Sequence, residues 1–247
     1  MRRIGRSMVV AFIVTGLAAV FTSRTSAKVN CPVAPPPGSV VNGGMIVTGV
    51  CILNQVTVRG GITVTATGSL ELENSFVSGG IDVAPGGELD LGHTLSSNTP
   101  TNNPSSITGG IKFNGRDLDL YNATVSGEVS VDGSAPNFFP SICGSNLSGA
   151  LKLQNIATTG GAFIGDPGEG FPANCAGNLI NGSLHVSDSV GLVEIEGNTI
   201  TGSVILDNST IELAGNTIGG SVQCTNVTFA SDGDPAPNTV GGAIHCP

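Results

Sequence analysis

An all-β fold of stacked coils, a single-stranded parallel β-helix (β-solenoid), is predicted by three features of the sequence. A glycine-led segment followed by an aliphatic–x–aliphatic triplet recurs ten times. A second alternating patch follows several of these triplets, as in Leu70-Glu71-Leu72. No helical periodicity appears after residue 27. Period-two alternation is typical of strands, and repeats of about 20 residues are typical of solenoids. We therefore expect about ten right-handed coils with disulfide-tied ends.

The repeat gives the register of the coils. Most starts lie 17 to 22 residues apart, with two longer intervals of 30 and 33 residues. The ten segments begin at Gly43, Gly60, Gly79, Gly109, Gly127, Gly149, Gly182, Gly202, Gly220 and Gly242. One coil buries too little apolar surface to be stable alone, so each strand must pair with its counterparts above and below. Asn or Gly between strands supplies corners with positive φ.

Asparagines also recur before the next glycine pair, at Asn178, Asn198, Asn216 and Asn238. When such positions stack, their side-chain amides can bond from coil to coil. We therefore expect an asparagine ladder along one corner of the column.

The N-terminal 27 residues have the pattern of a secretory signal peptide. Arg2, Arg3 and Arg6 precede an apolar run from Met8 to Phe21, and small or polar residues follow up to Ala27. The apolar run is too short for a permanent membrane span. We therefore exclude residues 1–27 from the fold and expect secretion, with the product extracellular or loosely attached to the cell surface.

The remaining chain is strongly acidic. Four of the nine basic residues lie in the N-terminal segment, so five basic and eighteen acidic residues remain, a net charge of −13. This balance argues against nucleic acid and against insertion into an anionic membrane. An extracellular polysaccharide or a surface protein is the expected kind of partner.

Six cysteines in an oxidising compartment indicate disulfides, and no paired CxxC spacing of a zinc site is present. Cys224 and Cys246 occupy the same inward column of neighbouring coils, close enough to bond. Among fifteen connectivities, nearest-neighbour pairing is preferred for the others, which are Cys31 with Cys51 and Cys143 with Cys175. We divide the chain into a proline-rich N-terminal cap at 28–41 and a solenoid at 42–247, and we expect both ends to be built against further stacking.

With this repeat and this pattern of cysteines, the chain resembles secreted bacterial parallel β-helix proteins, most of which are uncharacterised. The resemblance rests on lines of the form N-T-[IV]-x-G-[GS]-[VI] and on the terminal coil NTIGGSVQC followed by PAPNTVGGAIHC. It implies a β-helix fold without implying an activity, because this architecture carries enzymes and adhesins alike.

The first outward column, between the inward residues of each triplet, has mixed chemistry. It reads Ile46, Thr63, Asp82, Lys112, Ser130, Lys152, His185, Ile205, Gln223 and His245. Asp82 beside Lys112 is the one acid–base pairing, and a solvated ion pair is its simplest interpretation. The column offers no paired carboxylates for general acid–base catalysis. An enzyme acting on polysaccharides, as a lyase or glycoside hydrolase, would have to combine Asp82, Asp90 and Asp119 with Lys112 or Arg116.

The second outward column is acidic. Glu71, Asp90 and Asp119 lie on successive acid-bearing coils, and Glu194 and Glu212 continue the column further on. Neighbouring carboxylates repel one another unless a cation neutralises them, and such oxygen-rich sites suit Ca²⁺. A Ca²⁺-dependent binding module is therefore one alternative. The other interpretation is a hydrated acidic face that keeps the column soluble.

Three insertions, near 92–107, 132–146 and 165–178, are longer than a corner requires. Two of them carry Phe138-Phe139 and Phe171, which a Cys143–Cys175 bridge would hold side by side. Exposed aromatic residues there would contact a ligand or partner, whereas buried ones would only anchor the loops. Our leading hypothesis is a non-catalytic extracellular structural, adhesive or surface-interaction module without a cofactor.

Overall fold

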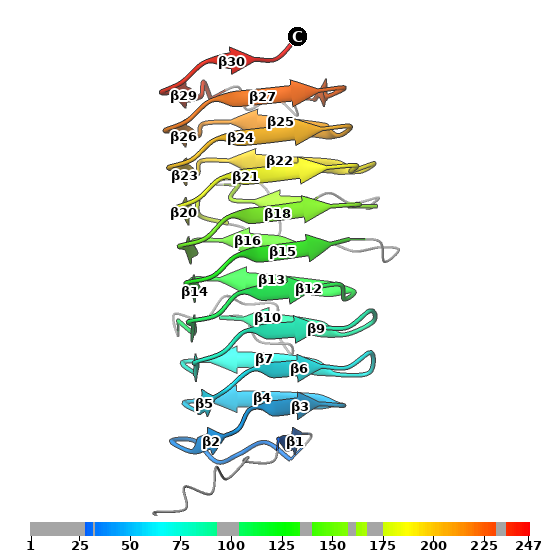
Figure 1. Cartoon of the computed structure of the whole chain (residues 1–247), viewed down its shortest axis with the longest axis vertical. Helices are drawn as coiled ribbons and strands as arrows, with labels where there is room; N and C mark the ends of the chain where they lie inside the picture. The colour runs from blue at the N-terminus through cyan, green and yellow to red at the C-terminus, as the bar shows by residue number, and fades with distance from the viewer. Residues whose placement is uncertain are drawn as a thin grey trace, which may run out of the picture.

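A computed structural model describes residues 28–31, 33–92, 104–133, 140–157, 162–166, 175–230 and 236–247. Within these residues the chain forms thirty short strands and no helix, and all strand pairs in the three sheets are parallel. No helix suited to crossing a membrane is found in the described ranges. The predicted signal peptide lies outside them. The predicted parallel β-solenoid of about ten coils is confirmed (Figure 1).

Three sheets, here called A, B and C, form the walls of the column. Sheet A contains β1 (Val29–Cys31), β3 (Met45–Val47), β6 (Ile62–Val64), β9 (Ile81–Val83), β12 (Ile111–Phe113), β15 (Val129–Asp132), β18 (Leu151–Gln154), β21 (Leu184–Ser187), β24 (Val204–Asp207), β27 (Val222–Thr225) and β30 (Ile244–His245). Sheet B contains β2 (Val40–Asn42), β5 (Thr57–Arg59), β8 (Phe76–Val77), β11 (Ser106–Ile107), β14 (Thr124–Val125), β17 (Asn146–Leu147), β20 (Leu179–Ile180), β23 (Thr199–Ile200), β26 (Thr217–Ile218) and β29 (Thr239–Val240). Sheet C contains β4 (Val50–Asn54), β7 (Ser69–Glu73), β10 (Glu88–Leu91), β13 (Asp117–Tyr121), β16 (Ser141–Cys143), β19 (Ala162–Ile164), β22 (Leu192–Glu196), β25 (Thr210–Ala214) and β28 (Thr228–Phe229).

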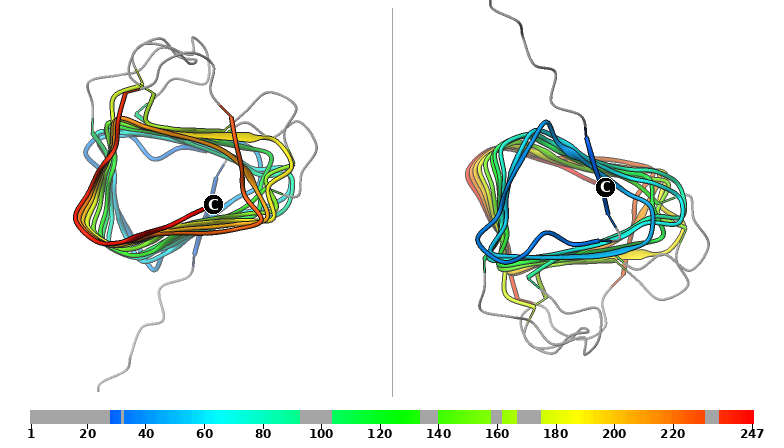
Figure 2. Two further views of the ribbon diagram at one scale, coloured as in Figure 1. Left: turned by 90° about the horizontal axis from the view of Figure 1, so that it is seen from above. Right: turned by 90° about the horizontal axis from the view of Figure 1, so that it is seen from below.

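Each coil runs from sheet A to sheet C and then to sheet B, which gives the column a triangular cross-section (Figure 2). In Figure 1 the chain rises from the N-terminal end, with the front strands pointing right and the rear strands pointing left. This path is a right-handed coil, as parallel crossover connections favour.

The glycine-led triplets are the strands of sheet A, and the second alternating patches are strands of sheet C, as the repeat predicts. Along each strand the aliphatic residues point inward and form one continuous core. Leu70 and Leu72 of β7, for example, are fully buried on the inner side, and Ile62 and Val64 of β6 face them from sheet A. Burial of these side chains across neighbouring coils supplies the apolar contacts that a single coil lacks.

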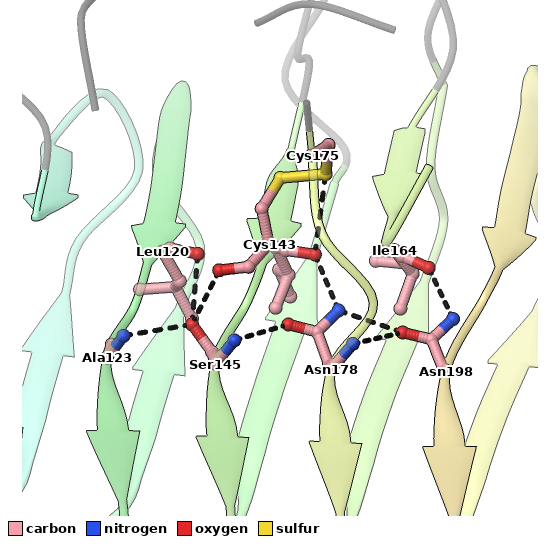
Figure 3. The surroundings of a disulfide bond; sticks show 9 residues. Leu120, Ala123, Cys143, Ser145, Ile164, Cys175, Asn178 and Asn198 are labelled. Atoms are coloured by element: carbon pink, nitrogen blue, oxygen red, sulfur yellow. Dashed lines mark hydrogen bonds between the residues drawn. A yellow bond between two sulfur atoms is a disulfide. The ribbon is translucent and has the colours of Figure 1, made fainter. Parts of the chain in front are cut away.

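The predicted corners and ladder are also present. Positive φ occurs at the non-glycine corner residues Gln55, Asn74, Asn122, Asn155, Asp188, Asn208 and Asn226. Between sheets C and B, Asn198 Oδ1 accepts bonds from the backbone N and Nδ2 of Asn178, both at 2.9 Å (Figure 3). Asn198 Nδ2 donates in turn to Asn216 Oδ1 at 3.0 Å. Ser145 continues the ladder toward the N-terminus by donating its backbone N–H to Asn178 Oδ1. The side-chain oxygens thereby pair the buried backbone N–H groups of Asn178 and Asn198, while their backbone carbonyls accept bonds from the next coil.

All three predicted disulfides are present. Cys31 bonds to Cys51, Cys143 to Cys175 and Cys224 to Cys246, with Cα–Cα distances of 5.7, 4.8 and 4.7 Å. The residues of the predicted cap, 28–41, already provide β1 and the first residues of β2, so they pair with the following coils. Of the three predicted insertions, the central residues lie outside the described ranges.

The two ends of the column differ. At the N-terminal end, the inward residues Cys31, Met45 and Cys51 are fully buried, which agrees with the predicted cap. At the C-terminal end, Ile244 and Phe229 are 63% and 46% exposed. The Cys224–Cys246 bridge ties this last coil, as predicted, and residues 231–235 of the coil lie outside the described residues.

Candidate functional site

The outward column of sheet A has the register that the repeat predicts. Thr63 lies beside Asp82, Asp82 beside Lys112 and Lys112 beside Ser130 on four successive strands. The column continues through Lys152 and on to His245. The side chains of neighbouring coils are thus held about 4.8 Å apart on a rigid ladder.

A groove of about 570 Å³ runs along this face near the N-terminal half of the column. Its charged and hydroxyl-bearing lining residues come from four coils and from the segment before β1; they are Lys28, Thr63, Asp82, Lys112, Glu128 and Ser130. The backbone of Gly61, Gly80 and Gly110 completes the lining.

The glycine pairs explain why the face is hollow there. The second residue of each pair is glycine at positions 61, 80 and 110, whereas the corresponding residue of the next coil is Glu128. A Cβ on Gly110 would lie 2.5 Å from the backbone oxygen of Glu128, so the local backbone leaves no room for a side chain. In later coils the same position carries Ala150 and then Ser183, Ser203 and Ser221, and Ser203 Oγ accepts a bond from the backbone N of Ser221 at 3.1 Å. The end of the glycine row therefore limits the groove to the N-terminal half.

The groove contains both basic and acidic side chains. Lys28 Nζ donates to Thr63 Oγ1 at 3.2 Å, and Lys152 Nζ lies 2.8 Å from Glu128 Oε2. Asp82 and Lys112 are exposed neighbours, but no ion pair joins them among the contacts of the described residues. The predicted ion pair between these two is therefore wrong, and both groups face solvent in the groove.

The acidic column on the outer face of sheet C also has the predicted register. Glu71 pairs with Asp90, Asp90 with Asp119, and Glu194 with Glu212. Ser141 and Phe163 occupy the column between the two groups of acids.

The surroundings of these acids differ from the predicted hydrated stripe. Glu71, Asp90 and Glu212 are only 3%, 3% and 2% exposed, although they point away from the core. Glu71, Asp119, Glu194 and Glu212 each have an interaction partner. The prediction of a solvated acidic face is therefore wrong, because strand alternation identifies the outward side without showing whether that side is covered.

Burial changes the protonation of this column. Burial, with added repulsion from Asp119 and Asp117, raises the pKa of Asp90 to about 9, so its carboxyl group is protonated at neutral pH and bonds with Asp119. Burial and the charge of Asp119 likewise raise the pKa of Asp117 to about 6 and raise the pKa of Tyr121. Sequence reasoning missed Asp117 and Tyr121, which flank Asp119 at two-residue spacing in β13 and so share its face.

The Cys143–Cys175 bridge lies on the same outer side of sheet C. Tyr121 is the ladder neighbour of Cys143, and both pack with Cys175 and Phe163 in a small cluster separate from the core. Asp166 and Cys175 form an antiparallel bridge beside it. The predicted contact residues Phe138, Phe139 and Phe171 lie outside the described residues.

The structure shows where the residues of the two alternative hypotheses, a polysaccharide-active enzyme and a Ca²⁺ site, lie. Asp82 and Lys112 lie on the outer face of sheet A, whereas Asp90 and Asp119 lie on that of sheet C, so the residues of the enzyme hypothesis do not form one site. Arg116 immediately precedes β13 and pairs with Glu88 of β10, with Nη2 and Oε1 2.6 Å apart. No group of three or more His, Cys, Asp or Glu side chains in the described part of the chain has the arrangement of a metal site. Ca²⁺ binding stays a prediction.

Comparisons with known proteins add no family: no family model matches the chain, and neither a curated protein nor a solved structure matches it. The fold and the groove are therefore the observations from which a function has to be argued.

Proposed function

We propose that this chain is a secreted, non-catalytic β-solenoid that binds an acidic extracellular polysaccharide through the groove on sheet A. The observation that carries this proposal is the distribution of basic residues. Only five basic residues follow position 27, and three of them, Lys28, Lys112 and Lys152, gather at this groove. The residues after position 27 have a net charge of −13, and this is the place on them where an anionic polymer meets the least repulsion.

The other lining groups fit a hydroxyl-rich ligand. Thr63 and Ser130 offer hydroxyl groups, and the carboxylate of Asp82 can accept hydrogen bonds from sugar hydroxyls. Among the described residues no aromatic side chain lines the groove, so binding would rely on hydrogen bonds and charge pairs. The groove is open along several coils, which suits a chain molecule that continues beyond the binding site.

Two further observations support the non-catalytic and secreted parts of the proposal. Asp82 and Lys112 lie on sheet A, away from Asp90 and Asp119 on sheet C, and Arg116 on the sheet C side is paired with Glu88. Three disulfides are consistent with folding in an oxidising compartment, as is the signal-like N-terminus.

The proposal is tested by calorimetric titration of the oxidised chain from Lys28 onward with a polyuronide and with neutral dextran. We expect binding of the polyuronide alone, and we expect the affinity to fall with added salt because the contacts are charged. Lys112→Glu should weaken binding about tenfold, since it replaces an attraction between exposed charges by a repulsion.

Arg59→Glu is the matched control, because Arg59 is an exposed basic residue in β5 of sheet B and the charge change is the same. Equal losses in the two variants would show that overall charge, and not the groove, determines binding. Release of reducing ends or unsaturated products, abolished in Asp90→Ala, would contradict the proposal and favour an enzyme instead.

A further inference from the structure

The charges of the groove follow a regular order along the column. Lys28 Nζ bonds with the threonine hydroxyl of β6, Asp82 lies on β9, and Lys112 lies on β12. On the next two coils, Glu128 immediately precedes β15 and Lys152 lies on β18. Basic and acidic groups therefore alternate over five successive strands of sheet A, which can be followed by their labels in Figure 1.

The basic groups are two ladder steps apart. The strands β6, β9, β12, β15 and β18 are consecutive neighbours in sheet A. Since neighbouring strands lie about 4.8 Å apart, Lys28, Lys112 and Lys152 act at heights separated by about 10 Å. Asp82 and Glu128 lie at the heights between them. The groove therefore attracts an anion at every second step and repels one at the steps between.

The central charges of this series are available to a ligand. Asp82 and Lys112 are exposed, and neither takes part in an ion pair within the described part of the chain. Glu128 and Lys152, in contrast, form an ion pair of 2.8 Å in which each side chain is 48% exposed. An exposed ion pair of this kind is weak, so a carboxylate of the ligand can replace Glu128 as the partner of Lys152.

A row of glycines determines the direction in which a chain molecule can lie. Gly61, Gly80 and Gly110 line the groove on successive coils and contribute no side chain to it. The space that they leave runs across the strands, along the axis of the column. A polymer in this space therefore passes one coil after another, and each of its units meets the charge of one coil.

The length of a sugar unit makes the order of the charges selective. An extended polysaccharide advances by nearly one ladder step per sugar. A polymer with a carboxylate on every sugar would place some of its charges beside Asp82 and Glu128, where they are repelled. A polymer in which acidic and neutral sugars alternate would place its carboxylates at the lysines alone. Its neutral sugars would lie beside Asp82, whose carboxylate accepts hydrogen bonds from hydroxyl or amide groups.

We infer that the groove prefers a polysaccharide with a two-sugar repeat, in which an acidic sugar alternates with a neutral one. This inference rests on the proposed function and adds the class of polymer to it. Lys112 pairs with a carboxylate of the ligand, and Asp82 determines specificity by repelling a second carboxylate on the adjacent sugar. The outer lysines, Lys28 and Lys152, lie four ladder steps apart, so a fragment with three acidic sugars fills the groove.

Calorimetric titration of the oxidised chain from Lys28 onward with two five-sugar fragments tests this inference. One fragment comes from hyaluronan and has uronic acids alternating with N-acetylated amino sugars, with a uronic acid at each end. The other comes from polymannuronate, in which every sugar is acidic. We expect the hyaluronan fragment to bind about tenfold more tightly although it carries fewer charges, because it avoids the repulsion at Asp82 and Glu128.

Asp82→Asn should reduce this preference to about twofold. It should strengthen binding of the polymannuronate fragment about fivefold by removing a repulsion between exposed charges, and leave binding of the hyaluronan fragment nearly unchanged. Asp188→Asn is the matched control, because Asp188 is an exposed acid at a corner between sheets A and C. Its φ of 54° is one that asparagine adopts readily. This control should leave both affinities unchanged, and circular dichroism checks that each variant is folded.

The possible outcomes separate this inference from the proposed function. Binding of neither the fragments nor the long polymers would contradict the proposed function and the inference together. Equal affinity for the two fragments, or tighter binding of polymannuronate, would overturn the inference while the groove still binds acidic polysaccharide. An equal effect of Asp82→Asn on both fragments would likewise overturn it, because Asp82 would then act only through the overall charge.

Discussion

Replacing Asp90 by asparagine should make the protein more stable at neutral and alkaline pH. Asp90 is 3% exposed, lies between Glu71 and Asp119, and has its pKa raised from 3.8 to about 9. An asparagine amide has nearly the same shape as the protonated acid and can also donate a hydrogen bond to Asp119. It never ionises, so folding of the variant does not require the uptake of a proton at this position.

The sign and size of the effect follow from proton linkage. Between pH 3.8 and about 9 the folded chain keeps the Asp90 proton, whereas the unfolded chain releases it. Folding therefore takes up a proton in this window, and the free energy of unfolding falls as pH rises, by about 1.4 kcal/mol per pH unit from this group. By pH 7 the wild type has lost on the order of 4 kcal/mol that Asp90→Asn keeps. Below pH 4 the two proteins should have nearly equal stability.

Urea unfolding monitored by circular dichroism at a series of pH values from 4 to 9 measures this difference. Asp82→Asn is the control, because it removes the same charge from an exposed position on sheet A. The reasoning is refuted if the stabilities of the wild type and Asp90→Asn run parallel across the series, or if Asp90→Asn is less stable throughout.

Three other changes have specific expected outcomes. Asn198→Ala should lower the free energy of unfolding by about 3 kcal/mol or more, because it leaves several buried ladder groups unpaired; Asn181→Ala, at an exposed position, should cost much less in the same urea assay. Gly110→Ala should destabilise the column by about 1–3 kcal/mol through the contact of its Cβ with the Glu128 backbone oxygen, whereas Ala150→Gly, at the equivalent position of a later coil, should cost under about 1 kcal/mol. Under mild reduction followed by alkylation and mass spectrometry, the half-buried Cys224–Cys246 bridge should open before Cys31–Cys51, whose cysteines are fully buried; simultaneous opening would contradict this order.

Most of the fold could be predicted from the sequence because the repeat marks the start of each coil. Once Gly60, Gly79 and Gly109 are aligned, every outward residue after them is assigned a neighbour, and Thr63, Asp82 and Lys112 have those neighbours in the structure. The pairing of Cys224 with Cys246 follows from the same register. These predictions needed only the spacing of strands and the alternation of side chains.

The candidate site was harder to predict, because it depends on whether the outward side chains of a sheet are covered by other residues or exposed to solvent. Alternation placed Asp90 on the outer side of sheet C but could not show that this side is covered, so its burial and raised pKa were missed. The groove was missed for a different reason, although its signal is present in the sequence. The second glycine of each pair, at positions 61, 80 and 110, is replaced by Glu128 in the next coil. Successive coils without a side chain at the same position leave a groove along the sheet.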